Sequence, residues 1–271
     1  MDCSIVIPVF NQLSFTADCL KTLNATGVPD ARIVIVNNAS TDGTKEFLEG
    51  RSELRVIHNP VNHGCGFAWT QGAKASTAVW TVILNNDVLI TPGWLEGMVS
   101  FGEEEKFDVV SPAMCHGEHD YDLAAYAPAF VKKMSHARRE GVASGVCFMV
   151  HRRVFDSIGF FDGDPRLGGY EDDEFFRRAR GAGFRLAITG RAFLHHFGSV
   201  TQKSIQKSLN RPNASLGDRA YYRQKYQLTW FKLRRDRLRQ AVQLARWRLQ
   251  ERWRYGETLQ SRRIAGVVEQ L

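Results

Sequence analysis

The sequence has few cysteines, and they form no pattern that would hold a metal ion or a disulfide framework. The five cysteines are scattered without a CxxC pair, and their number is odd: Cys3, Cys19, Cys65, Cys115 and Cys147. Disulfide-stapled domains and zinc modules use paired cysteines at short spacing. Both classes are therefore disfavoured, and we expect reduced thiols in a cytoplasmic protein.

A long apolar run and an export signal are missing as well. No apolar stretch approaches the roughly 18 residues that a membrane-spanning helix needs. The chain enters an apolar run at Ser4 without a basic segment before it and without a small-residue cleavage site after it. We expect neither a membrane span nor a cleaved signal.

Two common nucleotide-binding motifs are absent. The chain contains no GxxxxGK[ST] sequence, so nothing supports a P-loop enzyme. Residues 62–68 contain a Gly-x-Gly, but Ala68 and Trp69 stand where the dinucleotide fingerprint has its third glycine, and the loop lies far from the first predicted strand. A dehydrogenase is rejected on these grounds.

What the sequence does have is an ordinary globular composition with uneven charge. Its 271 residues are 44% hydrophobic and 24% charged, which suits one large α/β domain with or without an appendage. Between Arg219 and Arg263, fourteen Lys or Arg residues face three acids, whereas the rest of the chain has 22 basic and 26 acidic residues. A mildly acidic body and a strongly basic tail predict two regions with different partners.

The body alternates between strand and helix patterns. Short β-branched runs predict strands over 4–10, 31–36, 54–57 and 80–84, and helical spacing predicts helices over 14–25 and 66–75. Thr91 followed by Pro92 predicts the start of a further helix that runs through Met98. This alternation favours a mostly parallel sheet covered on both faces, with ligands bound beyond the carboxyl ends of the strands.

Polar side chains follow three of the predicted strands. They are Asn11, the segment 37–40, and the tripeptide 85–87, Asn-Asn-Asp. Each alone is explained by a turn, since Asn, Asp and Ser initiate turns. Together they form a polar rim with one carboxylate, Asp87, and a hard oxygen ligand there suits Mg²⁺ or Mn²⁺ bridging the phosphates of a nucleotide.

Four consecutive acids, residues 171–174, stand where a glycine turn becomes an amphipathic helix. Acids in the first turn stabilise a helix by ~0.3–1 kcal/mol each, which would explain an isolated cluster. Carboxylates held there are also able to do proton chemistry. The pattern alone leaves both interpretations open.

A family resemblance emerges from several motifs in one order. They are IVIPVFN, IVIVNNASTDGT, NPVNHGCGFAWTQGAKAS, VILNNDV, SGVCFMVHRRVFDSIGFFD, GGYEDDEFFRRARGAGFRL and LHHFGSVT. The segment from about residue 3 to 204 resembles glycosyltransferase family 2. The resemblance implies a GT-A fold, a nucleotide-sugar donor, a divalent metal, and transfer with inversion at the anomeric carbon in polysaccharide or glycoconjugate biosynthesis.

The resemblance also implies roles for single positions. The residues matched to the donor nucleotide site are Pro8, Phe10, Asn11, Asn38, Asn62, Gly64, Phe67, Asn85 and Asn86. Asn38 stands where the family often has an aspartate that binds the base edge. Asn85-Asn86-Asp87 matches the family's D-x-D motif with its first acid replaced, which leaves Asp87 as the metal ligand.

The catalytic positions follow in the same way. Asp172 matches the family's general base, and Glu171 beside it is a positioning or acceptor-binding residue. Asp173 and Glu174 are expected to cap the helix or face solvent.

A second group of matched positions contacts metal or phosphate. Of the two adjacent histidines, His196 is expected in preference to His195 to contact the metal or the diphosphate. Thr201 and Lys203 lie within reach of phosphate, although Lys203 is more typical of a solvated loop. Asp162 is expected to be mainly structural, at the edge of the acceptor site.

The resemblance suggests a catalytic domain over 1–210 and a basic helical extension over 211–271. Apolar residues at helical spacing predict amphipathic helices in the extension. Three roles stay open for it: packing on the catalytic domain, contact with an anionic membrane surface, or docking of an acidic partner. Nothing in the body supports nucleic-acid binding.

The expected donor is a UDP-, GDP- or dTDP-sugar, and the acceptor is a glycan, a lipid-linked saccharide, a protein or a small metabolite. Two alternatives remain beside the transferase. A sugar-phosphate nucleotidyltransferase would also place nucleotide and metal at the end of a parallel sheet, and a catalytically silent GT-A scaffold would use the same fold for binding only.

Overall fold

A computed structural model describes residues 2–198, 200, 201, 205 and 217–271. The strands are β1 Cys3–Val9, β2 Ile33–Asn38, β3 Arg55–Asn59, β4 Trp80–Leu84, β5 Val88–Ile90, β6 Val109–Gly117, β7 Arg138–Glu140, β8 Cys147–His151, β9 Leu186–His196, β10 Gln260–Ile264 and β11 Val267–Gln270. The helices are α1 Leu13–Ala25, α2 Thr44–Glu49, α3 Cys65–Lys74, α4 Trp94–Glu105, α5 Leu123–Met134, α6 Arg152–Ile158, α7 Glu171–Gly181, α9 Arg219–Lys225 and α10 Trp230–Tyr255. Two short 3₁₀ helices cover Asp30–Arg32 and Pro165–Leu167.

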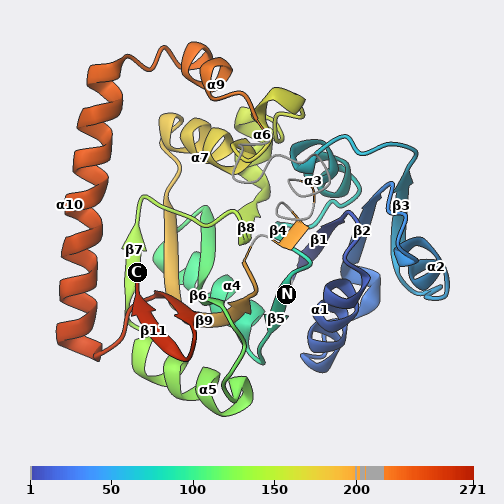
Figure 1. The fold of residues 1–271 in the computed structure, drawn as a ribbon, viewed down its shortest axis with the longest axis horizontal. Coiled ribbons are helices and arrows are strands. Elements are labelled where there is room, and N and C mark those ends of the chain that lie inside the picture. The colour runs from blue at the N-terminus through green and yellow to red at the C-terminus, as the bar shows by residue number, and fades with distance from the viewer. Residues whose placement is uncertain (1, 199, 202–204, 206–216) are drawn as a thin grey trace.

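The described strands belong to one sheet, whose main path runs β11-β10-β6-β8-β4-β1-β2-β3 (Figure 1). The first half is parallel, since β1 pairs with both β2 and β4, and β2 pairs with β3. β8 enters antiparallel between β4 and β6. β9 pairs in parallel with β6 and carries the short antiparallel strands β5 and β7. The predicted α/β class is confirmed; the strands β4, β1, β2 and β3 are parallel, and the sheet as a whole is mixed.

The buried strands place alternate side chains on the two faces of the sheet. In β1, Ile5 and Ile7 pack with α1 and α4 on one face, whereas Val6 packs with α3 on the other. α6 and α7 cover the same face as α3 through Phe155 and Phe175. β1 is buried at every position and, apart from Ser4, apolar, as expected for a strand covered on both sides. α7 is thereby fixed beside the carboxyl end of β1.

The helix predicted to have Thr91 as its N-cap and Pro92 as its first residue begins two residues later. Gly93 is its N-cap with a positive φ of 77°, and α4 starts at Trp94. Thr91 is buried and its hydroxyl donates to the carbonyl of Phe193 (2.6 Å), so it ties the end of β5 to β9 instead of capping a helix. Pro92 lies in the turn between β5 and α4.

The C-terminal segment combines helices with a hairpin. α9 and α10 confirm the helical pattern, and α10 runs along the outer edge of the molecule (Figure 1). The last residues differ from a purely helical extension, because β10 and β11 form an antiparallel hairpin that pairs in parallel with β6. The hairpin is therefore part of the central sheet.

Two sequence features have plain structural counterparts. All five cysteines are free thiols. Among the described residues, no helix combines the length and the apolar character that crossing a membrane requires.

A buried ion pair fastens α10 to β7. Arg139 donates to both carboxylate oxygens of Glu251, at 2.8 and 2.9 Å, and to the carbonyl of Leu271 at 2.7 Å. Glu251 also accepts from the backbone N–H of Leu259 (2.9 Å). The two charged side chains are only 3% and 6% exposed, so each depends on the other for its charge compensation.

Replacement of Glu251 by Ala should destabilise the fold strongly. The change leaves the buried Arg139 guanidinium without its counter-charge, which costs roughly 3–5 kcal/mol in buried pairs of this kind. Chemical denaturation measures the free energy of unfolding. The matched control is Glu49→Ala, which breaks the exposed pair between Lys45 and Glu49 and should change stability by about 0.5 kcal/mol or less. Equal effects of the two substitutions would contradict this account of α10.

Candidate active site

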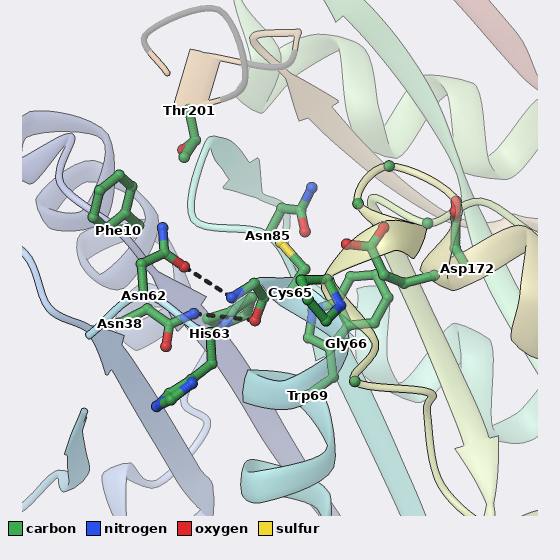
Figure 2. A pocket seen from close by; sticks show the side chains of 18 of the residues that line it. Phe10, Asn38, Asn62, His63, Cys65, Gly66, Trp69, Asn85, Asp172 and Thr201 are labelled. Atoms are coloured by element: carbon green, nitrogen blue, oxygen red, sulfur yellow. Dashed lines mark hydrogen bonds between the residues drawn. The ribbon is translucent and has the colours of Figure 1, made fainter. Parts of the chain in front are cut away.

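A cavity of about 620 Å³ lies at the carboxyl ends of β1, β2 and β4 (Figure 2). Strand ends line one side through Pro8, Asn38 and Asn85, and the start of α3 forms its floor. The loop 144–146 and the first residues of α7 close the other side. The position agrees with the rule that parallel α/β sheets bind ligands beyond the carboxyl ends of their strands.

The side chain of Asn38 joins two neighbouring segments of this cavity through hydrogen bonds. Its amide nitrogen donates to the carbonyl of Gly64 (3.1 Å), and its amide oxygen accepts from Asn59 (2.8 Å). Asn62 accepts from the N–H of Gly64 (2.9 Å), so both asparagines hold the same turn (Figure 2). Gly64 has a φ of 85°, a conformation that favours glycine, at the entry to α3. The predicted nucleotide-covering segment is thus fixed in place by the end of β2.

Most residues predicted for the donor nucleotide line this cavity, but two do not. Pro8, Phe10, Asn38, Asn62, Gly64, Asn85 and Asn86 are among its lining residues. Asn11 lies outside it, because its side chain accepts from the N–H of Thr41 (2.7 Å) and its own N–H donates to Ser40 (2.8 Å). Phe67 packs against His63, with ring centroids 4.5 Å apart, on the outer side of α3. Asn11 therefore holds the turn after β2, and Phe67 contacts the lining residue His63 without lining the cavity itself.

Asp87 is buried at the edge of the cavity and already has hydrogen-bond partners. Its carboxylate accepts from the N–H of Val200 (3.1 Å) and lies 3.4 Å from Nε2 of His196. Burial opposes the charged form, but the hydrogen bond and the charge of His196, together with the Val200 N–H, outweigh it and hold the pKa of Asp87 below its usual value. The predicted pair of Asp87 and His196 is brought together.

The two adjacent histidines point in different directions, as successive residues of a strand do. Nδ1 of His196 lies 2.8 Å from Nδ1 of His116, whose Nε2 lies 2.9 Å from the side-chain oxygen of Gln260. His195 instead meets the hydroxyl of Tyr121 (3.1 Å) and does not line the cavity. Burial lowers the pKa values of His195 and His116 to about 4, so both are neutral at pH 7. The structure therefore does not bring His195 to Asp87.

Glu171 and Asp172 occupy the first two positions of α7 and both line the cavity. Burial raises the pKa of Asp172 to about 6, and the adjacent Asp173 adds to the shift. Burial also raises the pKa of Glu171 to about 7, helped by the charge of Asp172. Glu171 is 7% exposed, whereas Asp172 is more open to the cavity. Of the two, Asp172 is better placed to meet a substrate.

Two glycines make this arrangement of α7 sterically feasible. A Cβ atom at Gly145 would overlap with Oδ2 of Asp172, and a Cβ atom at Gly66 would overlap with the carbonyl of Asp162. The same added atom at Gly66 would approach Cγ of Glu171 to 3.3 Å. α3 and the loop 144–146 thus come close enough to hold both carboxyl groups. In the sequence Gly66 stood out only as part of a Gly-x-Gly, and Gly145 did not stand out.

The remaining acids of α7 separate into two environments. Asp173 is exposed, as expected. The expectation that Glu174 caps the helix or faces solvent is wrong, because it is 1% exposed and binds Arg178, Lys225 (3.0 Å) and the hydroxyl of Tyr226 (2.6 Å). Lys225 also donates to Asp162, which lines the cavity. α9 is therefore connected to the site by two ion pairs.

The outer end of the cavity includes Thr201. Lys203, for which the sequence left a phosphate contact open, lies outside the described residues.

The charged side chains among the described lining residues of the cavity are all acidic, although Lys225 pairs with Asp162 and Arg166 pairs with Asp164. Asp87, Asp162, Asp164, Glu171 and Asp172 line the cavity, and no Lys or Arg occurs among the lining residues that the structure describes. A diphosphate in this cavity needs a counter-charge, and carboxylate oxygen is the donor that Mg²⁺ and Mn²⁺ prefer. No group of three or more His, Cys, Asp or Glu residues converges on one point within the described ranges. The residues present fit a metal with few protein ligands that is completed by substrate oxygens.

A family model for "Glycosyl transferase family 2" matches residues 4–159, which is more than half of the chain. The chain belongs to glycosyltransferase family 2. The matched range contains the strand ends and Asp87, and α7 lies beyond it.

A sequence relative and two solved structures extend this result. Glycosyltransferase AglE of Haloferax volcanii is 24% identical over 241 residues, which cover 83% of this chain and 78% of AglE. Mannosyltransferase PcManGT of Pyrobaculum calidifontis, solved with GDP-Man and Mn²⁺, has a TM-score of 0.56 at 17% identity, covering 79% of this chain and 65% of that one. TarS 1–349 of S. aureus with UDP-GlcNAc has a TM-score of 0.55 at 18% identity, covering 72% and 58%.

The two solved structures support the GT-A fold for this chain. This chain spans less than two thirds of each of those structures.

Replacement of Glu171 by Gln should stabilise the fold at alkaline pH. The folded-state pKa of about 7 exceeds the ordinary 4.5, so the folded protein loses stability as the pH rises through this window, and the loss is complete above it. A glutamine cannot ionise, and the variant should gain up to about 3 kcal/mol at pH 8, with the gain disappearing below about pH 4. Unfolding by denaturant at several pH values measures this. The exposed Glu53→Gln is the control, and a gain for Glu171→Gln that is independent of pH would contradict the argument.

Proposed function

We propose that this family 2 enzyme is an inverting glycosyltransferase that moves a sugar from a nucleoside diphosphate to an acceptor hydroxyl. The observation that carries the proposal is the position of Asp172, at the first turn of α7 and in the cavity beyond the strand ends. A pKa of about 6 leaves this carboxylate ionised at pH 7 while keeping it more basic than an ordinary aspartate. Asp172 is therefore the general base.

The reaction balances with these residues. The acceptor oxygen attacks the anomeric carbon and forms the new glycosidic bond, while its proton passes to the carboxylate of Asp172. The bond between the anomeric carbon and the diphosphate oxygen breaks, and its electron pair leaves with the nucleoside diphosphate. Because attack comes from the side opposite the leaving group, the anomeric configuration inverts. Glu171 lies deeper in the wall and positions the start of α7.

Asp87, with His196 beside it, would hold a divalent metal. Mg²⁺ or Mn²⁺ supplies the positive charge that stabilises a leaving diphosphate. The role of this chain is to keep the Asp87 carboxylate ionised and oriented through His196 and the Val200 N–H. The other acidic side chains that line the cavity support the need for a cation there.

The donor is a UDP-, GDP- or dTDP-sugar. Complexes of PcManGT with GDP-Man and of TarS with UDP-GlcNAc support this class of donor. Asn38 lies at the position matched to the base. Its side-chain nitrogen already donates to Gly64, and its side-chain oxygen accepts from Asn59. That oxygen can accept one more hydrogen bond, so it would bind a donor group on the edge of the base. The acceptor is a glycan, a lipid-linked saccharide or a protein, and we place the reaction in the cytoplasm.

Asp172→Asn should abolish transfer and spare donor binding. Loss of a general base lowers the rate roughly 10²–10⁴-fold, while the amide keeps the shape of the side chain. Turnover of donor in the presence of acceptor and calorimetric donor binding measure the two effects separately. Asp173→Asn is the matched control, since this neighbouring carboxylate is exposed, and it should retain near wild-type rates. Undiminished transfer by Asp172→Asn would exclude this residue as the base.

Asp87→Asn should remove the metal dependence of donor binding. Wild-type protein should bind its donor much more tightly with Mn²⁺ than with chelator, because the metal offsets the repulsion between diphosphate and the acidic cavity. The variant should bind equally weakly under both conditions. The control is Asp18→Asn on the exposed side of α1. If the variant kept the full effect of Mn²⁺, Asp87 would not be a metal ligand.

A further inference from the structure

α10 is a 26-residue helix in which only Glu251 is buried. One side carries five exposed apolar residues, which we call the α10 stripe: Phe231, Leu238, Val242, Leu249 and Trp253. Their spacings of seven and four residues return to one side of an α-helix. Their exposed fractions are 77%, 66%, 61%, 72% and 81%. This is the largest run of exposed apolar side chains on any described helix.

The stripe faces away from the body of the protein. Glu251 and Trp247 approach β7, where Glu251 pairs with Arg139 and Trp247 lies under the same guanidinium. At 100° per residue, these two positions fall on the side of α10 opposite to the centre of the stripe. α10 itself lies along the outer edge of the molecule (Figure 1).

Exposed arginines border the stripe on both sides. Arg234 and Arg252 follow one border, and Arg239 and Arg246 follow the other. The two acids of α10, Asp236 and Glu251, lie on the opposite side of the helix, and Glu251 is buried in its ion pair. The stripe is thus a mainly apolar centre between two positive borders, interrupted by the exposed Arg235.

This charge pattern decides which occupant fits. If two copies paired through the stripe, their arginine borders would meet with no carboxylates between them, and like charges at such borders disfavour helix pairing. An anionic lipid surface complements both parts, because apolar side chains enter the boundary of the acyl chains and arginines meet the phosphate headgroups. Trp253 suits the interfacial region between the two.

We propose that the protein docks on anionic lipid surfaces through the α10 stripe, with α10 lying in the plane of the interface. The proposal goes beyond sugar transfer and does not depend on it, since it uses none of the residues that line the cavity. It would bring the cavity to acceptors held at a membrane.

The test is co-sedimentation of the full chain with vesicles, without donor or metal. One vesicle type contains phosphatidylcholine alone, and the other contains phosphatidylcholine and phosphatidylglycerol. Leu238→Gln/Leu249→Gln removes apolar contact, and Val61→Gln/Val79→Gln is its control at exposed apolar positions elsewhere. Arg239→Gln/Arg246→Gln removes charge, and Lys21→Gln/Lys45→Gln is its control on α1 and α2. Circular dichroism and light scattering report folding and oligomeric state.

Wild-type protein should bind the anionic vesicles selectively and lose binding as salt is raised. Each α10 variant should bind roughly tenfold more weakly, whereas both controls should bind like the wild type. The proposal is overturned if folded wild-type protein stays in the supernatant at low salt, or if Leu238→Gln/Leu249→Gln binds undiminished, which would show that charge alone, and not the stripe, drives binding. A wild-type dimer that this variant dissociates would show that a second copy occupies the stripe. Because donor is absent throughout, none of these results bears on the transferase activity.

Discussion

Carboxyl groups gathered in one partly buried cavity are the constraint around which this structure is organised. The carboxyl groups come from the end of β4 and from the start of α7, and their surroundings shift their pKa values in different directions. Asp87 stays ionised because His196 and a backbone N–H compensate it, whereas Asp172 and Glu171 have raised pKa values. Two carboxyl environments within one site are the arrangement that acid–base chemistry at neutral pH requires. The same carboxyl groups make a bound diphosphate dependent on a cation.

The C-terminal segment contributes to this site although it comes last in the chain. Lys225 in α9 binds Asp162 and Glu174, so it fixes the approach to α7. Gln260 in β10 contacts His116, which contacts His196 beside Asp87. Both carboxylate regions of the cavity therefore have supporting contacts from residues after 217. An extension that only tethered the enzyme would need neither set of contacts.

The sequence predicted the fold class and the strand ends because both follow from local patterns. Apolar runs give the strands, and parallel strands bring their carboxyl ends to one edge of a sheet, which places Asn38 and Asp87 together. Gly145 could not be found in this way, since its role is to leave space for a side chain 27 positions away. Glu174 was misjudged because its partner, Lys225, is distant in sequence. β10 was missed because its residues, Gln-Ser-Arg-Arg-Ile, are too polar to predict a strand without the open edge of β6.

The central claim is that this cavity transfers sugar with inversion, and the anomeric form of the first product tests it most directly. Slow hydrolysis of an α-linked nucleotide sugar with Mn²⁺, followed by NMR, uses water as the acceptor and needs no knowledge of the natural one. After a panel of UDP-, GDP- and dTDP-sugars has identified the donor, the account predicts that the free sugar first appears as the β anomer together with nucleoside diphosphate. First appearance of the α anomer, or no hydrolysis of any donor by folded protein, would contradict it.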